Sequence, residues 1–421
     1  MRRPVKDFLY SIGVSFEGFC NGMIGGWMFG YIDALKLAGV QTVLFCISAR
    51  VTEPVRYTHK ATGATICVLP APKIYNRVRC PMLKPYGWTL KDVFGDVGGV
   101  RYPLFALLKD AAPYLATPLG SLARELKRKG CSAILCQEYE YARFDACVLL
   151  GQWLRLPVFA TFQGGNFQMS RFEKPLRPLT LRACAGLIVA TQTERERVLS
   201  RYGISPAKVV QIFNPLDLGM WEAMDRTEAR AALGIPSDAQ VVVWHGRVDI
   251  HRKGLDILLE AWQKVCRDRA DRDLRLLLVG TGSDASRLRD RIAAMQLRGV
   301  MRVEEYVLDR TAIRRYLSAA DVYTLPSRHE GFPVAPLEAM ACSLPVVAAD
   351  APGVPNIFEG GEAAGGLVVA REDAKALAIA LAKVLDRPDW GRELGKRARC
   401  RVETCFSLEA VGRQLYDVFF S

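Results

Sequence analysis

Short apolar runs alternate with helix-like segments along most of the chain, and this pattern restricts the fold more than any other feature. The apolar runs have the length and composition of strands. They cover 8–15, 42–47, 132–138, 157–165, 186–193, 208–217, 241–248, 274–280, 301–307, 321–326, 344–349 and 367–370. Strands that alternate with helices form parallel sheets with helices on both faces. The chain is therefore predicted to be an α/β protein with two doubly wound sheets, with a hairpin over 54–70.

A change of composition divides the chain near residue 214. The length of 421 residues suggests two or three domains. Asn214-Pro215 is a turn signal, and it follows the last strand of the first series. We therefore predict a first domain over 1–214 and a second domain that begins at 215.

Positive charge is concentrated in the first half. Residues 1–214 hold 28 Lys and Arg against 14 Asp and Glu, whereas 215–421 hold 29 against 30. An anionic membrane, a nucleic acid or an anionic acceptor could meet such a surface, and a generally basic soluble surface is the alternative. Nucleic acid ranks last, because none of the usual binding motifs is present.

Residues 73–130 mix basic and aromatic side chains. Helices are predicted near 103–111 and 114–129, and the aromatic residues include Tyr75, Trp88, Tyr102 and Phe105. This mixture suits a surface that contacts lipid headgroups, with Arg77, Arg79 and Lys84 as contributing charges. The same helices could instead bury their apolar faces against a sheet.

Cysteine usage and the N-terminus indicate the compartment. The twelve cysteines include no C-x-x-C pair and most lie within apolar runs, which predicts reduced thiols in a cytoplasmic protein without a zinc site. No run approaches the roughly 18 apolar residues of a membrane span. The start of the chain mimics a secretory signal, but a glycine-rich loop over 18–26 and a helix follow it, so it is interpreted as a first strand.

The stretch 327–350 carries the most specific chemistry. Glu330 and Glu338 flank Gly331-Phe332-Pro333-Val334, and a helix is predicted to begin near Val334 to Pro336. The free N–H groups of a helix start bind anions, Gly331 allows close backbone approach, and the two carboxylates can accept hydroxyl hydrogen bonds. An anion between two polyols is the outline of a sugar nucleotide.

Two cations could complete an anion site. Arg247 ends a buried strand, and Lys253 follows six residues later. Cations aimed at a diphosphate stabilise the charge that develops as it leaves, although a solvated basic loop is the simpler explanation. His245, His251 and His329 flank these motifs, but a lone histidine is more often structural, and no cluster suggests a metal.

Polar residues also follow the strands of the first half. In an open α/β sheet, ligands bind beyond the carboxyl ends of the strands. Candidate acceptor-binding residues at this rim are Glu138, Glu140 and Asn166, and Gln163 is a candidate for the donor. Gln163 could equally be a turn residue.

These motifs resemble those of the family-4 retaining glycosyltransferases, which have the GT-B fold. The string EGFPVAPLEAM matches the E-x7-E signature, Gly246-Arg247 with Lys253-Gly254 matches the GR…KG pair, and 280–282 matches the G-x-G turn. The resemblance implies two Rossmann-like domains that face each other across a cleft, with 215–405 binding the nucleotide sugar. It also implies that the last helix crosses back, so that 406–421 packs on the first, acceptor-binding domain.

The resemblance assigns roles by position. Glu330, Arg247 and Lys253 are expected to be catalytic. The residues expected to bind the donor are Gly25, Gly26, Gln163, Gly246, Gly280, Gly282, Gly331, Phe332, Pro333, Val334 and Glu338. Many family members carry a histidine where Gln163 stands; glutamine cannot act as a general base, so no side chain of this loop is expected to take a proton.

The implied activity is a retaining, metal-independent transfer of a sugar from a nucleoside-diphosphate sugar, with a UDP-sugar as the first candidate, to a hydroxyl of an unidentified acceptor. No cofactor is expected, and front-side displacement is favoured. The protein would be cytoplasmic, with peripheral attachment to an anionic membrane as the alternative that the charge suggests. An inactive sugar-nucleotide-binding homologue, or an epimerase or phosphorylase on the same fold, remains an alternative.

Overall fold

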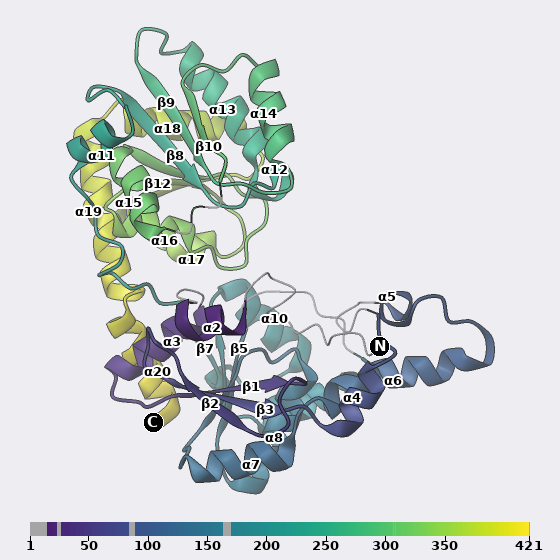
Figure 1. Cartoon of the computed structure of the whole chain (residues 1–421). Coiled ribbons are helices and arrows are strands. Elements are labelled where there is room, and N and C mark those ends of the chain that lie inside the picture. Colours follow the sequence, from purple (N-terminus) through teal and green to yellow (C-terminus); the bar gives the residue numbers. More distant parts are fainter. Residues whose placement is uncertain are drawn as a thin grey trace. The chain divides into compact units, whose positions relative to one another are not determined.

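The computed structural model describes residues 15–22, 27–83, 89–162, 170–305, 307 and 309–420, and these form two compact units (Figure 1). The N-terminal unit contains the described residues up to Ala190, Glu194–Ile212 and the chain from Gly412 onward. The C-terminal unit contains Thr191–Thr193 and Phe213–Val411. The main division thus falls between Ile212 and Phe213. The predicted strand over 8–15 lies outside the described residues.

The N-terminal unit holds two sheets. One has the order β1-β3-β2, with β1 (Val43–Ser48) parallel to β3 (Thr65–Pro70) and β2 (Val55–Thr58) antiparallel to it, which confirms the predicted hairpin. The other is entirely parallel, with the order β4-β5-β6-β7. Its strands are β4 (Ile134–Cys136), β5 (Val158–Phe162), β6 (Gly186–Val189) and β7 (Val209–Gln211). Every residue of β5 and β6 is buried, as expected for strands covered on both faces.

Helices connect and cover these strands. They are α2 (Phe16–Gly22), α3 (Trp27–Leu37), α4 (Lys73–Arg79), α5 (Leu90–Phe94), α6 (Tyr102–Leu115), α7 (Leu119–Arg128), α8 (Ala142–Leu154), α9 (Glu173–Ala183) and α10 (Gln192–Tyr202), with 3-10 turns at Gly99–Arg101 and Pro206–Lys208. The predicted loop over 18–26 is wrong in its first part, because α2 extends through Gly22. The buried Phe19 and Cys20 pack with Phe29 and Ile66 and stabilise that turn of helix despite its glycines.

The C-terminal unit contains one parallel sheet of six strands in the order β10-β9-β8-β11-β12-β13. The strands are β8 (Gln240–His245), β9 (Leu274–Val279), β10 (Val300–Val303), β11 (Val322–Leu325), β12 (Val346–Ala349) and β13 (Gly366–Val369). In chain order this is the 3-2-1-4-5-6 arrangement of a Rossmann fold. The direction of strand addition reverses between β8 and β11, and such a switch point is where this fold binds its ligands.

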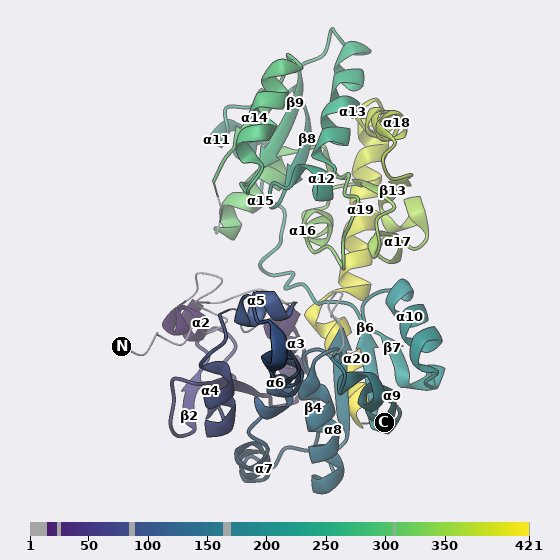
Figure 2. The same cartoon turned by 90° about the vertical axis from the view of Figure 1, so that its right-hand side faces the viewer.

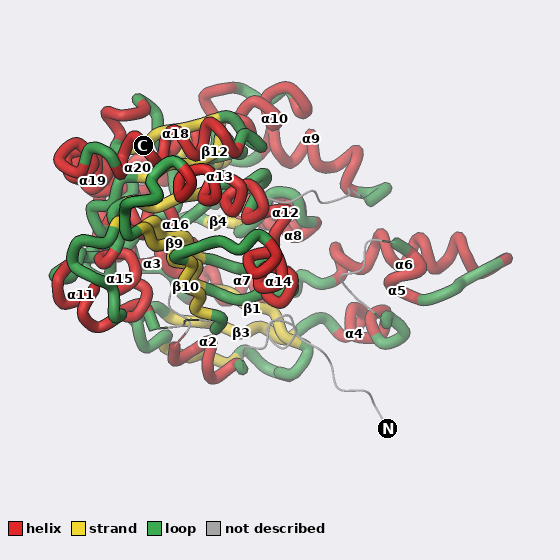
Figure 3. Tube along the Cα trace, turned by 90° about the horizontal axis from the view of Figure 1, so that it is seen from above, coloured by secondary structure: helices red, strands yellow, loops and turns green. Residues whose placement is uncertain are grey.

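Two helical layers cover this sheet. The helices are α11 (Arg226–Ala232), α12 (Ile250–Lys253), α13 (Leu255–Arg267), α14 (Ala285–Ala294), α15 (Arg310–Ala319), α16 (Ala335–Ala341), α17 (Val354–Ile357), α18 (Ala374–Leu385) and α19 (Pro388–Cys405), with a 3-10 turn at Gly361–Ala364. Alternate residues of β8 face opposite layers: Val242 packs with α13 and α18, which lie side by side (Figures 2 and 3), whereas Val243 packs with α16 and α19. The result is a three-layer α/β/α unit.

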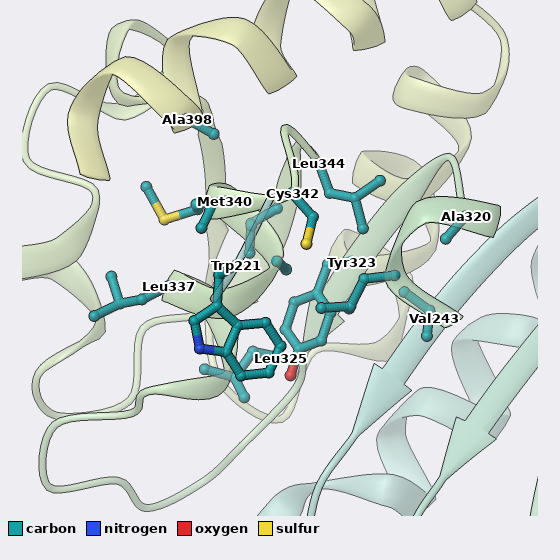
Figure 4. Packing of buried hydrophobic residues seen from close by; sticks show 14 of the residues in the cluster. Trp221, Val243, Ala320, Tyr323, Leu325, Leu337, Met340, Cys342, Leu344 and Ala398 are labelled. Carbon is teal, nitrogen blue, oxygen red and sulfur yellow. The ribbon is translucent and has the colours of Figure 1, made fainter. Parts of the chain in front are cut away.

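The core beneath α16 fixes the helix that carries Glu338. Leu337 and Met340 of α16 are buried with Trp221 and with Tyr323 of β11 (Figure 4). Since these apolar side chains are held on the core side, Glu338 remains on a partly exposed side of the same helix.

The last helix, α20 (Leu408–Phe420), begins in the C-terminal unit and belongs to the N-terminal unit from Gly412 onward. A Cβ at Gly412 would lie 2.2 Å from the carbonyl oxygen of Ala34, so glycine permits α20 to pack closely against α3. Phe419 contacts Phe159 of β5, with ring centroids 4.8 Å apart. Among the described residues, no helix is long and apolar enough to cross a membrane.

Candidate active site

The switch point of the C-terminal unit brings two predicted motifs together. β8 ends at His245, just before Gly246 and Arg247, and its neighbour β11 ends at Leu325, just before the loop that carries Glu330. Parallel strands present their carboxyl ends at one edge of the sheet, so both loops lie at that edge. Each side chain at this edge is held by identifiable contacts.

Lys253 and Glu330 form an ion pair, with Lys253 Nζ 2.6 Å from Glu330 Oε1. The Glu330 side chain is 7% exposed and the Lys253 side chain 19% exposed. Ser327 Oγ donates a second hydrogen bond to Glu330 Oε1, at 2.7 Å. Two predicted catalytic residues therefore contact each other directly, and the carboxylate of Glu330 is fixed by two donors.

Local backbone geometry places Lys253 beside β11. Asp249 caps α12 by accepting a hydrogen bond from the backbone N–H of Arg252, at 3.0 Å. Gly254 then ends this short helix in a left-handed conformation, with φ +63°. A Cβ at this position would lie 2.0 Å from the carbonyl oxygen of Pro326. The close approach of α12 to the end of β11 therefore requires glycine.

Arg328 holds the loop that carries Glu330 in place through hydrogen bonds. Its guanidinium donates to both carboxylate oxygens of Asp256, at 2.8 and 2.9 Å, and its backbone N–H donates to the carbonyl of Arg252. The hydrogen bond to Asp256 raises the pKa of Arg328. The sequence alone did not single out Arg328, because an arginine after a strand carries no specific signal.

His245 contacts Glu338, with His245 Nε2 2.7 Å from Glu338 Oε2. The imidazole is buried at the end of β8, and no described residue bonds to its Nδ1. The prediction treated His245 as structural, yet the structure shows it in direct contact with a predicted ligand-binding carboxylate. A histidine that directly precedes the Gly-Arg motif was the only available signal.

The loop between the two glutamates rests on aromatic packing. Phe332 stacks on Phe213, with centroids 5.4 Å apart, and lies 6.1 Å from Phe406. A Cβ at Gly353 would lie 2.2 Å from the carbonyl oxygen of Gly331, so the turn before α17 packs closely against this loop. Pro333 is buried and Val334 is exposed. The partly buried side chain of Phe332 therefore helps to hold this loop in place through aromatic packing.

The predicted glycines after β8 and β9 have a packing role. Gly280 has φ +135°, and a Cβ there would lie 2.0 Å from the carbonyl oxygen of Gly246. A Cβ at Gly282 would lie 2.2 Å from the carbonyl oxygen of Val248. These glycines let the two loops pack backbone against backbone, beside Arg247.

The other predicted residues are less well supported by their surroundings. Arg247 is exposed, and no described residue forms a hydrogen bond or ion pair with its guanidinium. Glu138 and Glu140 lie in the N-terminal unit after β4, where the buried Glu140 pairs with Arg197 at 2.8 Å. Gly25, Gly26, Gln163 and Asn166 lie outside the described residues. Within the described ranges, no cluster of three or more histidine, cysteine or acidic side chains could hold a metal ion.

Solved structures share this architecture over nearly the whole chain. Sucrose-phosphate synthase from Thermosynechococcus elongatus is 22% identical, with a TM-score of 0.64 over 95% of this chain and 94% of that one. Anabaena HepE, in complex with UDP and glucose, is 16% identical, with a TM-score of 0.64 over 94% of this chain and 96% of that one. The two Rossmann-like units define a protein of the GT-B class.

Family models and curated relatives narrow this class. Residues 38–219 match the model described as Glycosyltransferase Family 4, and residues 239–387 match the one described as Glycosyl transferases group 1. The chain belongs to the family-4 glycosyltransferases, as its motifs predicted. A D-inositol 3-phosphate glycosyltransferase from Kineococcus radiotolerans is 33% identical over 231 residues, which is 52% of this chain and 53% of that protein. The chain spans about half the length of the curated relatives it matches.

Proposed function

We propose that this protein transfers a sugar from a nucleoside-diphosphate sugar to a hydroxyl of an acceptor. The observation that carries the proposal is the convergence of the Lys253–Glu330 pair, the His245–Glu338 pair and Arg247 at one switch point. This edge offers two cations for a diphosphate and two fixed carboxylates for hydroxyls. Family membership and the fold shared with a UDP-bound protein support the same proposal and make a UDP-sugar the first candidate donor.

Arg247 and Lys253 would serve the diphosphate. The Arg247 guanidinium has five donors and no partner among the described residues. The Lys253 ammonium gives one of its three N–H groups to Glu330 and keeps two that a phosphate oxygen could accept. As the bond between sugar and phosphate breaks, negative charge grows on the leaving group, and both cations would stabilise it. These two cations, of which Lys253 is held in place by Glu330, can do this without a divalent metal, which is the mechanism we propose.

Each of the two carboxylates would bind the hydroxyls of a different part of the donor. Glu338, oriented by His245, would accept hydrogen bonds from the ribose. Glu330, with the backbone of Gly331 to Pro333, would hold the donor sugar. Glu330 is already bonded to Lys253 and Ser327, which suits a hydrogen-bond acceptor better than a nucleophile. We therefore propose retention by front-side displacement, in which the leaving phosphate oxygen helps to remove the proton of the acceptor hydroxyl.

For the acceptor, we propose a chemical class and no single compound. The curated relatives are named for inositol phosphate, and one structural neighbour is named for sucrose phosphate. A phosphorylated polyol would suit the excess of positive charge in the N-terminal unit. We therefore propose a hydroxyl-bearing, anionic acceptor.

Donor binding and turnover test this function directly. Mass spectrometry of nucleotide that co-purifies with the protein would identify the base, and calorimetry with UDP, GDP and ADP would rank the candidates. Incubation with the matching sugar nucleotide should then release the nucleoside diphosphate. Arg387→Ala is a matched control for Arg247→Ala, because Arg387 is an exposed arginine beyond the end of α18. The nearby Leu385 carbonyl bonds to Gln240 at the amino end of β8, which places the end of α18 at the edge of the sheet opposite the candidate site. If none of the three nucleotides binds, the proposal fails.

A further inference from the structure

Several large apolar side chains of α8 and α9 are exposed and lie outside the hydrophobic core. Leu149 is 57% exposed, Trp153 70% and Leu179 59%, and Leu176 is also exposed. The two helices pack against each other in the N-terminal unit (Figure 2). The α8–α9 face is defined here by these four residues together with Arg143, Arg155, Lys174 and Arg182.

The inner sides of the same helices already supply the core. Phe144, Cys147 and Val148 of α8 and Leu181 of α9 are buried against the parallel sheet. Scattered exposed leucines need no explanation, but several large apolar residues on one pair of adjacent helices mark an interaction surface. All four outward residues stay exposed, although the ammonium of Lys127 in α7 lies 5.7 Å from the centroid of the Trp153 ring.

Exposed basic side chains lie on or directly after the same two helices. Arg143, Arg155, Lys174 and Arg182 are exposed, and none of the four is paired with a carboxylate among the described residues. The acidic residues of the two helices, Asp145 and Glu173, are buried. By contrast, arginines of α19 form pairs within their own helix, including Arg397 with Glu393 and Arg399 with Glu403. The α8–α9 face therefore presents positive charge that nothing on the helices balances.

A buried network keeps the face rigid. Arg177 of α9 donates to both oxygens of Asp145 of α8, at 2.9 and 3.0 Å, and Tyr114 of α6 donates to Asp145 at 2.8 Å. All three helices are thereby joined through one carboxylate. A docking surface whose backbone is already fixed loses little conformational entropy on binding.

We propose that the α8–α9 face docks on the surface of an anionic lipid membrane. A lipid interface supplies both negative headgroups for the basic side chains and an apolar boundary for the leucines, and tryptophan favours that boundary. A second copy across a twofold axis would set the same positive charges against each other. A nucleic-acid backbone would leave the leucines unpaired. The inference concerns location and does not depend on the proposed transfer reaction.

Vesicle flotation tests the proposal with the full chain and no nucleotide. The protein should float with vesicles of phosphatidylcholine and phosphatidylglycerol in equal amounts, and much less with phosphatidylcholine alone. Lys174→Glu with Arg182→Glu should reduce the bound fraction at least roughly tenfold, given the strength of attraction per basic residue. The charge control is Lys375→Glu with Lys396→Glu, two exposed lysines of the C-terminal unit, which should bind as the wild type does.

A second pair of variants tests the apolar contribution. Leu149→Ser with Leu179→Ser should weaken flotation, whereas Leu37→Ser with Ile379→Ser, whose leucine and isoleucine are 57% and 60% exposed, should not. Circular dichroism and thermal unfolding verify that each variant is folded. Equal flotation on neutral and anionic vesicles, no flotation, or equal losses in face and control variants would overturn the proposal. A concentration-dependent dimer that only the face variants disrupt would overturn it in favour of self-association.

Discussion

Single residues of the candidate site are organised as pairs that hold each other in place. Lys253 restrains Glu330, and His245 restrains Glu338. A side chain held by a partner needs little reorganisation when a ligand arrives, which favours binding and catalysis. Pairing also means that a substitution at one residue changes the environment of the other. The two cations of the site should therefore behave differently when replaced.

Arg247→Ala and Lys253→Ala should each weaken binding of the nucleoside diphosphate by roughly ten- to a hundredfold, since a charged hydrogen bond to phosphate contributes about 1.5–3 kcal/mol. Only Lys253→Ala should also lower the free energy of unfolding, by about 1–3 kcal/mol, because it leaves the buried Glu330 carboxylate with Ser327 alone. Calorimetry and thermal unfolding measure the two effects. Unchanged affinity in both variants would contradict the phosphate role.

The two glutamates should separate binding from turnover. Glu338→Ala should weaken nucleotide binding, since it removes the expected ribose contact. Glu330→Gln should leave nucleotide affinity nearly intact while kcat falls by orders of magnitude, because its contact with the sugar strengthens mainly in the transition state. Calorimetry with the nucleoside diphosphate and steady-state kinetics distinguish the two profiles. Identical profiles for both variants would show that the division of roles is wrong.

The motif residues of the site could be predicted from the sequence, but their pairing could not. Lys253 and Glu330 are 77 positions apart, and His245 and Glu338 are 93 apart. Local patterns carry no information about such contacts. The strand order that joins β8 to β11 creates both pairs, so a prediction of their contact required the sheet topology as well as the motifs.

At the scale of elements, the predictions were strongest where apolar runs are long and regular. The runs 241–248 and 274–280 became β8 and β9. The weakest region was 73–130. There α4 and α5 are short, and neither was predicted. Phe105 packs edge-on against Phe94, with centroids 4.8 Å apart, and Trp88 and Lys84 lie outside the described residues. The exposed residues that mark the α8–α9 face were missed, because the sequence did not show which side of each helix would face outward.

The stability that the loop before α16 contributes should depend on pH, because Arg328 of this loop is bonded to the carboxylate of Asp256. Burial opposes the shift, but hydrogen bonds from Arg328 lower the pKa of Asp256 below its usual value. A lowered pKa in the folded state adds stability above the ordinary aspartate pKa, and this stability is lost as the pH falls through the folded pKa. Asp256→Asn should therefore cost about 1 kcal/mol at pH 7 for this partly exposed pair, and the cost should shrink toward pH 3.

Chemical denaturation at several pH values gives the measurement. Asp271→Asn is a suitable control, because Asp271 is exposed and forms no ion pair or side-chain hydrogen bond among the described residues. A difference between wild type and Asp256→Asn that stays constant from pH 7 to pH 3 would remove Asp256 as the source of the pH dependence.

At the scale of the whole molecule, the two halves differ in charge and in how that charge is used. The second half is nearly neutral, and many of its arginines are in ion pairs, including Arg226 and Arg230 with Asp321 and Arg269 with Asp386. The first half carries an excess of 14 positive charges, and part of that excess lies unpaired on the α8–α9 face. The residues of the proposed donor site lie in the neutral half, so the proposed donor chemistry does not account for the excess.

Salt should separate the two contributions to membrane binding. Attraction between exposed charges falls off within a Debye length, about 10 Å at 0.1 M salt and 3 Å at 1 M. Flotation of the wild type on anionic vesicles should therefore decrease steeply as salt rises. Leu149→Ser with Leu179→Ser should bind more weakly at every salt concentration but keep this dependence. Lys174→Glu with Arg182→Glu should lose most of it.

Reversal of Arg77, Arg79 and Lys84 tests the surface that the sequence predicted within residues 73–130. If the α8–α9 face is the principal contact, this reversal should reduce flotation less than reversal of Lys174 and Arg182 does, because charges away from the contact act only through a screened field. It should leave nucleotide affinity unchanged, since Arg247 and Lys253 belong to the other unit. The two variants are compared by flotation at low and high salt. A larger loss from the 77–84 variant would assign the principal contact to that region instead, and wild-type flotation that does not change with salt would contradict electrostatic docking altogether.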